Sequence, residues 1–253
     1  MDKKILSKFI LGCDLDNIQE TVIIAPCWLP ESVGLKDVNL ISDSSSKIWN
    51  CKVHGQYLTY ILTGVGACNC ADTVMALGNT ACKRIMFMGS AGAIDKRFCI
   101  GDIIFPHRFV VGEGATKYLQ KNLKHDTFGN IYNINERTCE PLLNSIIEPA
   151  QALGVACHSG TVISVESIYS QFQFIADFIK MGCQFIDMES SAFVAATKKI
   201  GIQGIVCFCI SDNVMKNQSL IAVSNQMTNF RKNIRKQLMP IIIQQYVQTP
   251  VRD

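Results

Sequence analysis

The sequence predicts an α/β protein, a mainly parallel sheet with helices on both of its faces. Apolar runs of strand length alternate along the chain with longer segments whose apolar residues recur every three or four positions. Three of these runs end in small or acidic residues, at 89–92 (Gly-Ser-Ala-Gly), 188–191 (Met-Glu-Ser-Ser) and 211–213 (Ser-Asp-Asn). Because parallel strands present their carboxyl ends at one edge of a sheet, we expect the three strings to meet at one site.

The expected elements follow one another as alternating strands and helices. Short apolar runs predict strands at residues 20–26, 48–63 (two strands joined at 54–56), 84–88, 101–106, 109–111, 158–165, 185–188 and 204–210. Apolar residues at helical spacing predict helices at 67–82, 138–153, 171–181, 190–200 and 220–241. The run at 204–210 is almost wholly apolar, which is typical of a strand buried in a parallel sheet. We expect a loop at 112–116, then an irregular connection at 117–135 that serves function or an interface.

We expect residues 1–253 to form a single domain. Proline, glycine and serine are scattered singly, and the sequence has neither a low-complexity linker nor an internal repeat. Hydrophobic residues make up 48% of the chain and charged residues 18%. This composition suits a deep core and a buried subunit interface, which favours a homo-oligomer such as a dimer, a trimer of dimers or a hexamer.

Charge and cysteine content narrow the class of protein further. The net charge of +3 is too small to predict a nucleic-acid or membrane partner, and residues 1–11 lack the apolar core of a secretion signal. Twelve cysteines in such a chain favour a reducing cytoplasm. The pairs Cys68/Cys70 and Cys207/Cys209 have no second pair or histidine at ligand spacing, so we expect no metal site.

Two small-residue strings have the composition of ligand-binding loops. At 89–92 uncovered backbone amides and the Ser90 hydroxyl can approach an anion or a sugar oxygen, although a tight turn without a ligand is the alternative. Gly64 and Gly66 precede a predicted helix, as in a dinucleotide-binding loop, but Asn69 takes the third glycine position. A loop that touches phosphate or ribose therefore fits better than a nicotinamide site.

Two carboxylates stand at predicted strand ends. Glu189 begins a helix, where it either complements the helix dipole or faces the site and binds vicinal hydroxyls with its two oxygens. Asp212 follows a buried strand, where it either caps the next helix or acts as a general acid whose pKa is raised by apolar surroundings.

In these strings the chain resembles the nucleoside phosphorylase and nucleosidase superfamily, which includes purine nucleoside phosphorylase, uridine phosphorylase and methylthioadenosine/adenosylhomocysteine nucleosidase. The resemblance runs from Thr21 to Ile243, and its most specific parts are 89–93 followed by 100–104, then 186–192, then 210–212. The strings at 113–116 and 160–169 are closest to a poorly characterised uridine-phosphorylase-like branch. The resemblance implies a mixed, partly barrel-like sheet flanked by helices, and cleavage of the bond between ribose and base.

The resemblance also implies roles for single residues. Glu189 would hold the ribose hydroxyls with Met188 beneath the sugar, Asp212 would protonate or hydrogen-bond the leaving base, and Glu31 would activate water in a hydrolytic enzyme. Ser90 and the backbone at 64–66 would hold phosphate or the attacking water. The remaining implied substrate-binding residues are Gly64, Gly66, Gly89, Ala91, Gly92, Glu166, Ser211, and Ile168 with Tyr169 as walls for the base.

The chain departs from the family where phosphate binds. Family phosphorylases carry a Gly-Asp-Pro-x-Arg loop after the first strand, whereas residues 25–31 read Ala-Pro-Cys-Trp-Leu-Pro-Glu, and the arginine expected three residues before Ser90 is Phe87. Neutral groups do not replace the charge-assisted bidentate contacts of arginine. His107, Arg108, Lys117 or a neighbouring subunit are the alternative sources of positive charge.

We therefore expect an enzyme that cleaves the N-glycosidic bond of a nucleoside, with phosphate or water as acceptor. Asp212 favours a purine over a pyrimidine base. No cofactor is expected, with phosphate as a possible co-substrate. The alternatives are a hydrolytic nucleosidase of the methylthioadenosine type, a non-catalytic nucleoside-binding protein of the same fold and, more distantly, a nicotinamide-dependent reductase.

Overall fold

One mixed sheet forms the centre of the molecule in the computed structural model, which describes residues 2–44, 46–123, 126–218 and 224–250. Its order is β2-β3-β4-β1-β5-β11-β10-β7-β8, with β12 beside β5, β6 beside β12 and β9 beside β6. The strands are β1 (Thr21–Ala25), β2 (Asn39–Asp43), β3 (Lys47–Val53), β4 (Gln56–Leu62), β5 (Arg84–Ala93), β6 (Ile103–Ile104), β7 (Arg108–Gly112), β8 (Ile131–Asn133), β9 (Cys157–His158), β10 (Thr161–Val165), β11 (Phe185–Asp187) and β12 (Gln203–Asn213).

Strand β5 organises the sheet. Its first half pairs in parallel with β1, and its whole length pairs in parallel with β12. Beyond the end of β1, β11 pairs with the last residues of β5 in the antiparallel sense. The carboxyl ends of β5, β11 and β12 therefore lie near one another. The sheet is mixed, as the resemblance implies.

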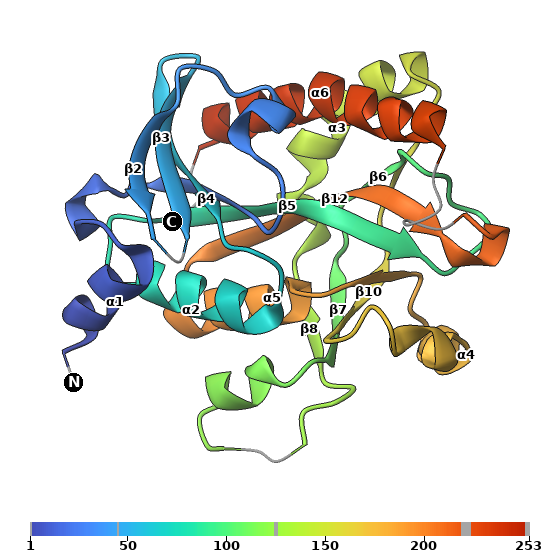
Figure 1. Ribbon diagram of the computed structural model, residues 1–253, viewed down its shortest axis with the longest axis horizontal. Helices are drawn as coiled ribbons and strands as arrows, with labels where there is room; N and C mark the ends of the chain where they lie inside the picture. Colours follow the sequence, from blue (N-terminus) through green and yellow to red (C-terminus); the bar gives the residue numbers. More distant parts are fainter. Residues whose placement is uncertain (1, 45, 124–125, 219–223, 251–253) are drawn as a thin grey trace.

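Helices cover both faces of this sheet, as Figure 1 shows. On one face lie α3 (Glu140–Ala152) and α6 (Asn225–Gln248), and on the other lie α1 (Lys3–Leu11), α2 (Ala67–Leu77) and α5 (Ser190–Ile200), while α4 (Ile175–Lys180) sits to one side. Because strand side chains alternate between faces, β5 contributes Met86 and Met88 to the core under α3 and α6, and Phe87 to the core under α2 and α5. The predicted two-sided packing is confirmed.

The two strands that carry the site run further than the sequence predicts. We expected a turn at Gly89 and a strand end at Ile210, but β5 continues to Ala93 and β12 to Asn213, paired residue by residue with one irregularity between Ile210 and Asp212. The expectation of a glycine turn at 89–92 is therefore wrong. A side chain at Gly89 would press on the Phe87 and Phe208 rings, and one at Gly92 would meet the Asp212 carboxylate.

Other differences lie at edges and ends of elements. Edge strand β2 was not expected. A 3-10 helix (Ala115–Leu119) joins the end of the predicted loop to the start of the connection at 117–135, which also contains edge strand β8. The strand predicted at 158–165 divides into β9 and β10, and the helix predicted at 171–181 begins as a 3-10 turn before α4. The C-terminal helix begins at Asn225, and the predicted helical positions Leu220 and Val223 lie outside the described residues.

Three further observations concern the chain as a whole. None of the helices described is both long and apolar enough to cross a membrane. All twelve cysteines, which lie within the described ranges, are free thiols. Within the same ranges no group of three or more histidine, cysteine or acidic side chains is arranged to hold a metal ion.

Candidate active site

A cavity of about 470 Å³ opens at the carboxyl ends of β5, β11 and β12. Seven residues expected from the sequence line it, namely Ser90, Gly92, Ile168, Met188, Glu189, Ser211 and Asp212. The other lining residues are Pro26, Cys27, Val65, Ala93, Ile94, Gln171, Phe172, Ile175, Ile186, Asp187, Val214, Asn217 and Gln218. The two carboxylates separated by 22 intervening residues thus share one hollow with Ser90, as the convergence of strand ends predicts.

Glu189 is held at the junction of two helices. It directly precedes α5 and is 4% exposed, and its Oε1 accepts a hydrogen bond of 2.6 Å from the amide of Gly66, the residue that precedes α2. Burial raises the pKa of Glu189, the charge of the nearby Asp187 raises it further, and the Gly66 amide opposes both. One oxygen is thus fixed by the protein, and the carboxyl group lies on the cavity wall.

Asp187 is a second buried carboxylate on the same wall, to which the sequence reasoning gave no role. Its oxygens accept hydrogen bonds from the hydroxyls of Ser164 (2.6 Å) and Ser190 (2.9 Å) and from the amides of Glu189 (3.1 Å) and Ser190 (2.6 Å). Burial raises the pKa of Asp187, and these four hydrogen bonds oppose the increase. Because four donors favour the ionised form, Asp187 ionises before Glu189 and fixes the backbone at residue 189.

Glu113 is bound to the first turn of α5. Its carboxylate accepts hydrogen bonds from the amides of Ala115 (2.6 Å) and Thr116 (3.1 Å) and from the Ser191 hydroxyl (2.9 Å). The loop string at 113–116 is therefore tied to the first turn of α5. Its contribution to the site is to hold the segment that carries Glu189.

Asp212 lies among the last paired residues of β12 and lines the cavity. The Ser211 hydroxyl donates a hydrogen bond of 2.6 Å to Oδ1 of Asp212, and Gly92 on the neighbouring strand leaves room for the carboxyl group. Burial raises the pKa of Asp212, while the Ser211 hydrogen bond and the charge of Arg231 oppose the increase. A carboxyl group that is protonated more readily than usual can donate a proton to a leaving group.

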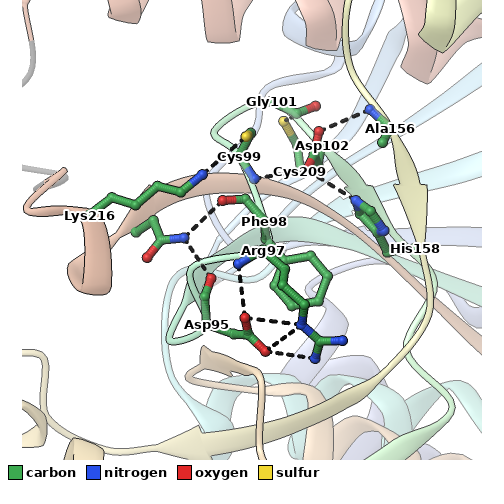
Figure 2. A network of polar contacts seen from close by, with 11 residues as sticks. Asp95, Arg97, Phe98, Cys99, Gly101, Asp102, Ala156, His158, Cys209 and Lys216 are labelled. Carbon is green, nitrogen blue, oxygen red and sulfur yellow. Dashed lines mark hydrogen bonds and ion pairs between the residues drawn. The ribbon is translucent and has the colours of Figure 1, made fainter.

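The strand end that carries Asp212 is anchored by the segment that follows β5 (Figure 2). The Asn213 side-chain amide donates hydrogen bonds of 2.9 Å to the carbonyls of Asp95 and Phe98, and Lys216 reaches the Cys99 sulfur at 3.2 Å. Asn213 thus serves the structure of the strand end, while the preceding residue faces the cavity.

Asp102 holds the segment that follows β5 through contacts with Cys99, Ala156 and His158. Its carboxylate accepts hydrogen bonds from the amides of Cys99 (2.8 Å) and Ala156 (2.9 Å), and it pairs with His158 at 3.1 Å (Figure 2). Burial opposes ionisation, but the hydrogen bonds from His158, Ala156 and Cys99 outweigh it and hold the pKa of Asp102 below its usual range. The Gly-Asp string at 101–102 therefore supports the site without lining the cavity.

Several residues that the resemblance implied lie away from the cavity wall. Gly64, Gly66, Gly89 and Ala91 are not among the lining residues, and the Gly66 amide is bound to Glu189. Glu166 is exposed and accepts a hydrogen bond from the Gly114 amide, and Tyr169 is 93% exposed. Glu31 is exposed in a short 3-10 helix (Pro30–Val33) and does not line the cavity either.

The expected sources of positive charge are also absent from this wall. Phe87 packs against Phe193 and Phe208 with ring centroids 5.4 and 5.8 Å away, in the core beneath α2 and α5. His107, Arg108 and Lys117 do not line the cavity. Among the described residues that line it there is no lysine, arginine or histidine.

The sequence did not predict most of the apolar wall or several polar residues of the cavity, which include Asp187 and Asn217. Cys27, Gln171 and Gln218 line the cavity, and Ile94, Phe172 and Ile175 supply apolar surface. The string at 186–189 contains Asp187 beside Glu189, so the second carboxylate had a sequence signal. Gln218 follows the Ser-Asp-Asn string by five residues and has no pattern of its own.

Comparison with known proteins identifies the family and the fold of the chain. The sequence pattern of the Phosphorylase superfamily matches residues 28–242. Among solved structures, the uridine phosphorylase from Vibrio fischeri ES114 is 20% identical with a TM-score of 0.75, covering 94% of this chain and 96% of that one. A uridine phosphorylase from the oomycete Phytophthora capsici is 13% identical with a TM-score of 0.76, covering 95% and 94%. The 5′-methylthioadenosine/S-adenosylhomocysteine nucleosidase from Neisseria meningitidis is 14% identical with a TM-score of 0.68, covering 89% and 99%. At these identities the structural matches establish the fold.

Proposed function

The chain belongs to the phosphorylase superfamily, and on this basis we propose that it cleaves the N-glycosidic bond of a nucleoside, with phosphate or water as acceptor. The observation that carries the proposal is the placement of Glu189, Asp212 and Ser90 on one cavity. Asp212 favours a purine as the leaving base, because a protonated carboxyl group can donate to a ring nitrogen.

The proposed reaction uses the two carboxyl groups at opposite ends of the substrate. Glu189 binds the ribose hydroxyls, and Met188 packs beneath the sugar. As the glycosidic bond lengthens, the sugar gains oxocarbenium character and the base gains negative charge. Asp212 donates its proton to the departing base, and the electron pair of the broken bond remains on that base. The acceptor then attacks the anomeric carbon from the side of Ser90. A phosphate ion forms ribose 1-phosphate directly, whereas a water molecule forms the ribose hydroxyl and releases one proton to the solvent.

Water has a specific observation in its favour as the acceptor. Phosphate binding depends on charge-assisted contacts with cationic side chains, and the described lining residues include none. Hydrolysis is therefore the second candidate function. Under phosphorolysis, the required charge would come from a neighbouring subunit.

We also propose that the protein acts as a cytoplasmic homo-oligomer without an organic cofactor. Large exposed apolar side chains support an interface, since Tyr169, Phe172 and Phe174 are 93%, 52% and 46% exposed. The twelve free thiols suit a reducing compartment. Light scattering after size-exclusion chromatography measures the subunit count, and a monomer at micromolar concentration would contradict the oligomer.

Release of free base from a panel of purine and pyrimidine nucleosides tests the activity, with and without inorganic phosphate. Ribose 1-phosphate as product identifies phosphorolysis, and free ribose identifies hydrolysis. The matched control is Asp177→Asn, an exposed aspartate paired with Lys180 on α4 and absent from the cavity wall. Nucleoside binding without release of base from any member of the panel would contradict the enzymatic proposal.

A further inference from the structure

The strand end that carries Asp212 is not fixed by regular pairing alone. Residues 203–210 of β12 pair one by one with residues 84–91 of β5, but the next pair joins Asp212 to Gly92, so Ser211 is an extra residue in the ladder. Such a β-bulge interrupts the pairing, bends the strand and changes the direction of the side chains that follow it. The direction of the Asp212 carboxyl group therefore depends on what holds the chain after the bulge.

The side chain of Asn213 holds the chain at this point. Asn213 is fully buried, and its amide nitrogen donates hydrogen bonds of 2.9 Å to the carbonyls of Asp95 and Phe98. Its Oδ1 accepts a hydrogen bond of 3.0 Å from the Met215 amide. Both hydrogens of the amide group are thus in use, as well as its oxygen. The strand end is thereby tied to the segment that follows β5 and to the turn that follows β12.

Main-chain contacts beyond the bulge are few. The Asn213 amide donates to the Gln218 carbonyl at 2.9 Å, and the Gln218 amide donates to the Asn213 carbonyl at 3.0 Å. These two hydrogen bonds form an isolated bridge outside the named strands. The side-chain hydrogen bonds of Asn213 therefore supply a large share of the contacts that fix the strand end.

The carboxyl group of Asp212 depends directly on this attachment. Consecutive side chains of a strand point to opposite sides, and Asp212 lines the cavity whereas Asn213 does not. The carboxyl group also packs closely, since a Cβ atom added at Gly92 would lie 3.1 Å from Oδ2 of Asp212. A reacting group that is displaced by about 1 Å can lose about 10²-fold in rate. Release of the strand end would therefore impair proton transfer from Asp212.

We propose that Asn213 is a positioning residue, which holds the Asp212 carboxyl group where its proton can reach the leaving base. The inference rests on the proposed function of the cavity. Asn213 does not touch the substrate in this scheme, and the proton that moves is the one on Asp212. Its effect on the reaction is therefore exerted entirely through Asp212.

Two substitutions and one control test this role. Asn213→Leu keeps the approximate shape of the side chain and removes all three of its hydrogen bonds, whereas the milder Asn213→Ser keeps one donor. Thr197→Val is the matched control, because Thr197 is 2% exposed, donates a hydrogen bond of 3.0 Å to the Val194 carbonyl within α5 and does not line the cavity. It loses a buried hydrogen bond without disturbing the attachment of Asp212.

The readouts are kcat and KM for base release, and the pKa of Asp212 from carbon-13 NMR of its carboxyl group. Asn213→Leu should lower kcat by about 10- to 100-fold and change KM by less than about threefold, with a smaller loss of kcat in Asn213→Ser. The pKa of Asp212, which burial raises, should fall in Asn213→Leu, because a released carboxyl group reaches solvent. Thr197→Val should change none of these quantities.

A double-mutant cycle distinguishes positioning from general support of the fold. In an Asp212→Asn background no proton donor remains to be positioned, so Asn213→Leu should lower the residual kcat by less than about threefold. An equal loss of kcat in both backgrounds, a comparable loss in Thr197→Val, or an unchanged pKa of Asp212 in both Asn213 variants would overturn the proposal.

The NMR titration does not require turnover, which separates this inference from the activity itself. A lowered pKa of Asp212 in Asn213→Leu, in a protein that cleaves no nucleoside, would support the attachment and refute the enzymatic function. Cleavage by the wild type that is indifferent to Asn213→Leu, with the pKa of Asp212 unmoved, would do the reverse. If no nucleoside is cleaved and the pKa is unmoved, both proposals fail.

Discussion

Replacement of Asp212 by asparagine separates the chemistry of the site from its stability. Asparagine has nearly the same shape and can still accept the hydrogen bond from the Ser211 hydroxyl, which lies 2.6 Å from Oδ1 of Asp212. It cannot carry the proton that the proposed mechanism transfers to the leaving base. The substitution therefore removes one catalytic function and leaves the packing beside Gly92 in place.

The expected loss follows from the role of a positioned acid. Such a group accelerates a reaction by about 10²- to 10⁴-fold, which corresponds to about 3 to 5 kcal/mol of activation free energy. Stability should move the other way. Because burial raises the pKa of Asp212 in the folded protein, its ionised form is disfavoured there relative to the unfolded chain at neutral pH. The neutral asparagine removes that penalty, so Asp212→Asn should be at least as stable as the wild type.

The assay is the rate of base release at saturating nucleoside, measured beside the urea midpoint of the same preparation. We expect kcat to fall by at least about 10²-fold with an unchanged or higher midpoint, and the exposed Asp177→Asn control to change neither. A general acid supplies at least about 10²-fold in rate. A kcat of Asp212→Asn within about threefold of the wild-type value would therefore refute the assignment of Asp212 as the general acid. A large loss of stability would refute the reasoning about its burial.

Three further predictions concern the neighbours of this group and the support behind it. Ser211→Ala removes a hydrogen bond that lowers the pKa of Asp212, so the high-pH decline of kcat/KM should move upward by about one pH unit; a downward shift would contradict the acid role. Glu189→Gln should lower kcat/KM for ribonucleosides by about 10- to 150-fold and reduce the discrimination against 2′-deoxynucleosides, and a loss equal for both sugars would exclude ribose recognition. Asp102→Asn should cost about 2 to 3 kcal/mol in urea unfolding at pH 7. Because the pKa of Asp102 is lowered in the folded protein, this difference should shrink as the pH falls below about 4, and a difference independent of pH would contradict the role of its charge.

The layered fold was predictable because its signals are local. Helix α5 begins and ends at the predicted residues, and the hairpin of β3 and β4 turns at His54 and Gly55, both with positive φ as a two-residue hairpin loop requires. Edge strands β2 and β8 were missed, since they are short and partly exposed, and their pairing is decided by neighbours distant in sequence.

The glycines of β5 led to the wrong prediction of a turn for a physical reason. Glycine usually marks a turn, but Gly89 and Gly92 lie within a paired strand because bulky neighbours, the Phe208 ring and the Asp212 carboxylate, occupy the space of a side chain. Those neighbours belong to another strand, so no local pattern records them. The convergence of Glu189 and Asp212 was predicted from parallel strand ends, and the two residues do share the cavity. The reason is different, because β11 is antiparallel to β5 and β12 is parallel to it.

The remaining parts of the candidate site depend on side-chain direction and on distant loops. Tyr169 and Ile168 are adjacent in sequence, yet the structure places only Ile168 on the cavity wall. Gln218 reaches the wall through a bridge to Asn213 that composition does not encode. Glu31, to which the resemblance assigned the activation of water, is exposed and does not line the cavity.

The position of Phe87 restricts how this protein could acquire strong phosphate binding. Phe87 and Ser90 are three positions apart on one strand, so their side chains leave the sheet on opposite sides. An arginine introduced at position 87 would enter the space between Phe193 and Phe208 and bury an unpaired guanidinium at a cost of about several kcal/mol. An arginine at this position therefore requires prior changes in both aromatic neighbours, and a laboratory selection for phosphate-dependent turnover should find its first gains elsewhere in the chain.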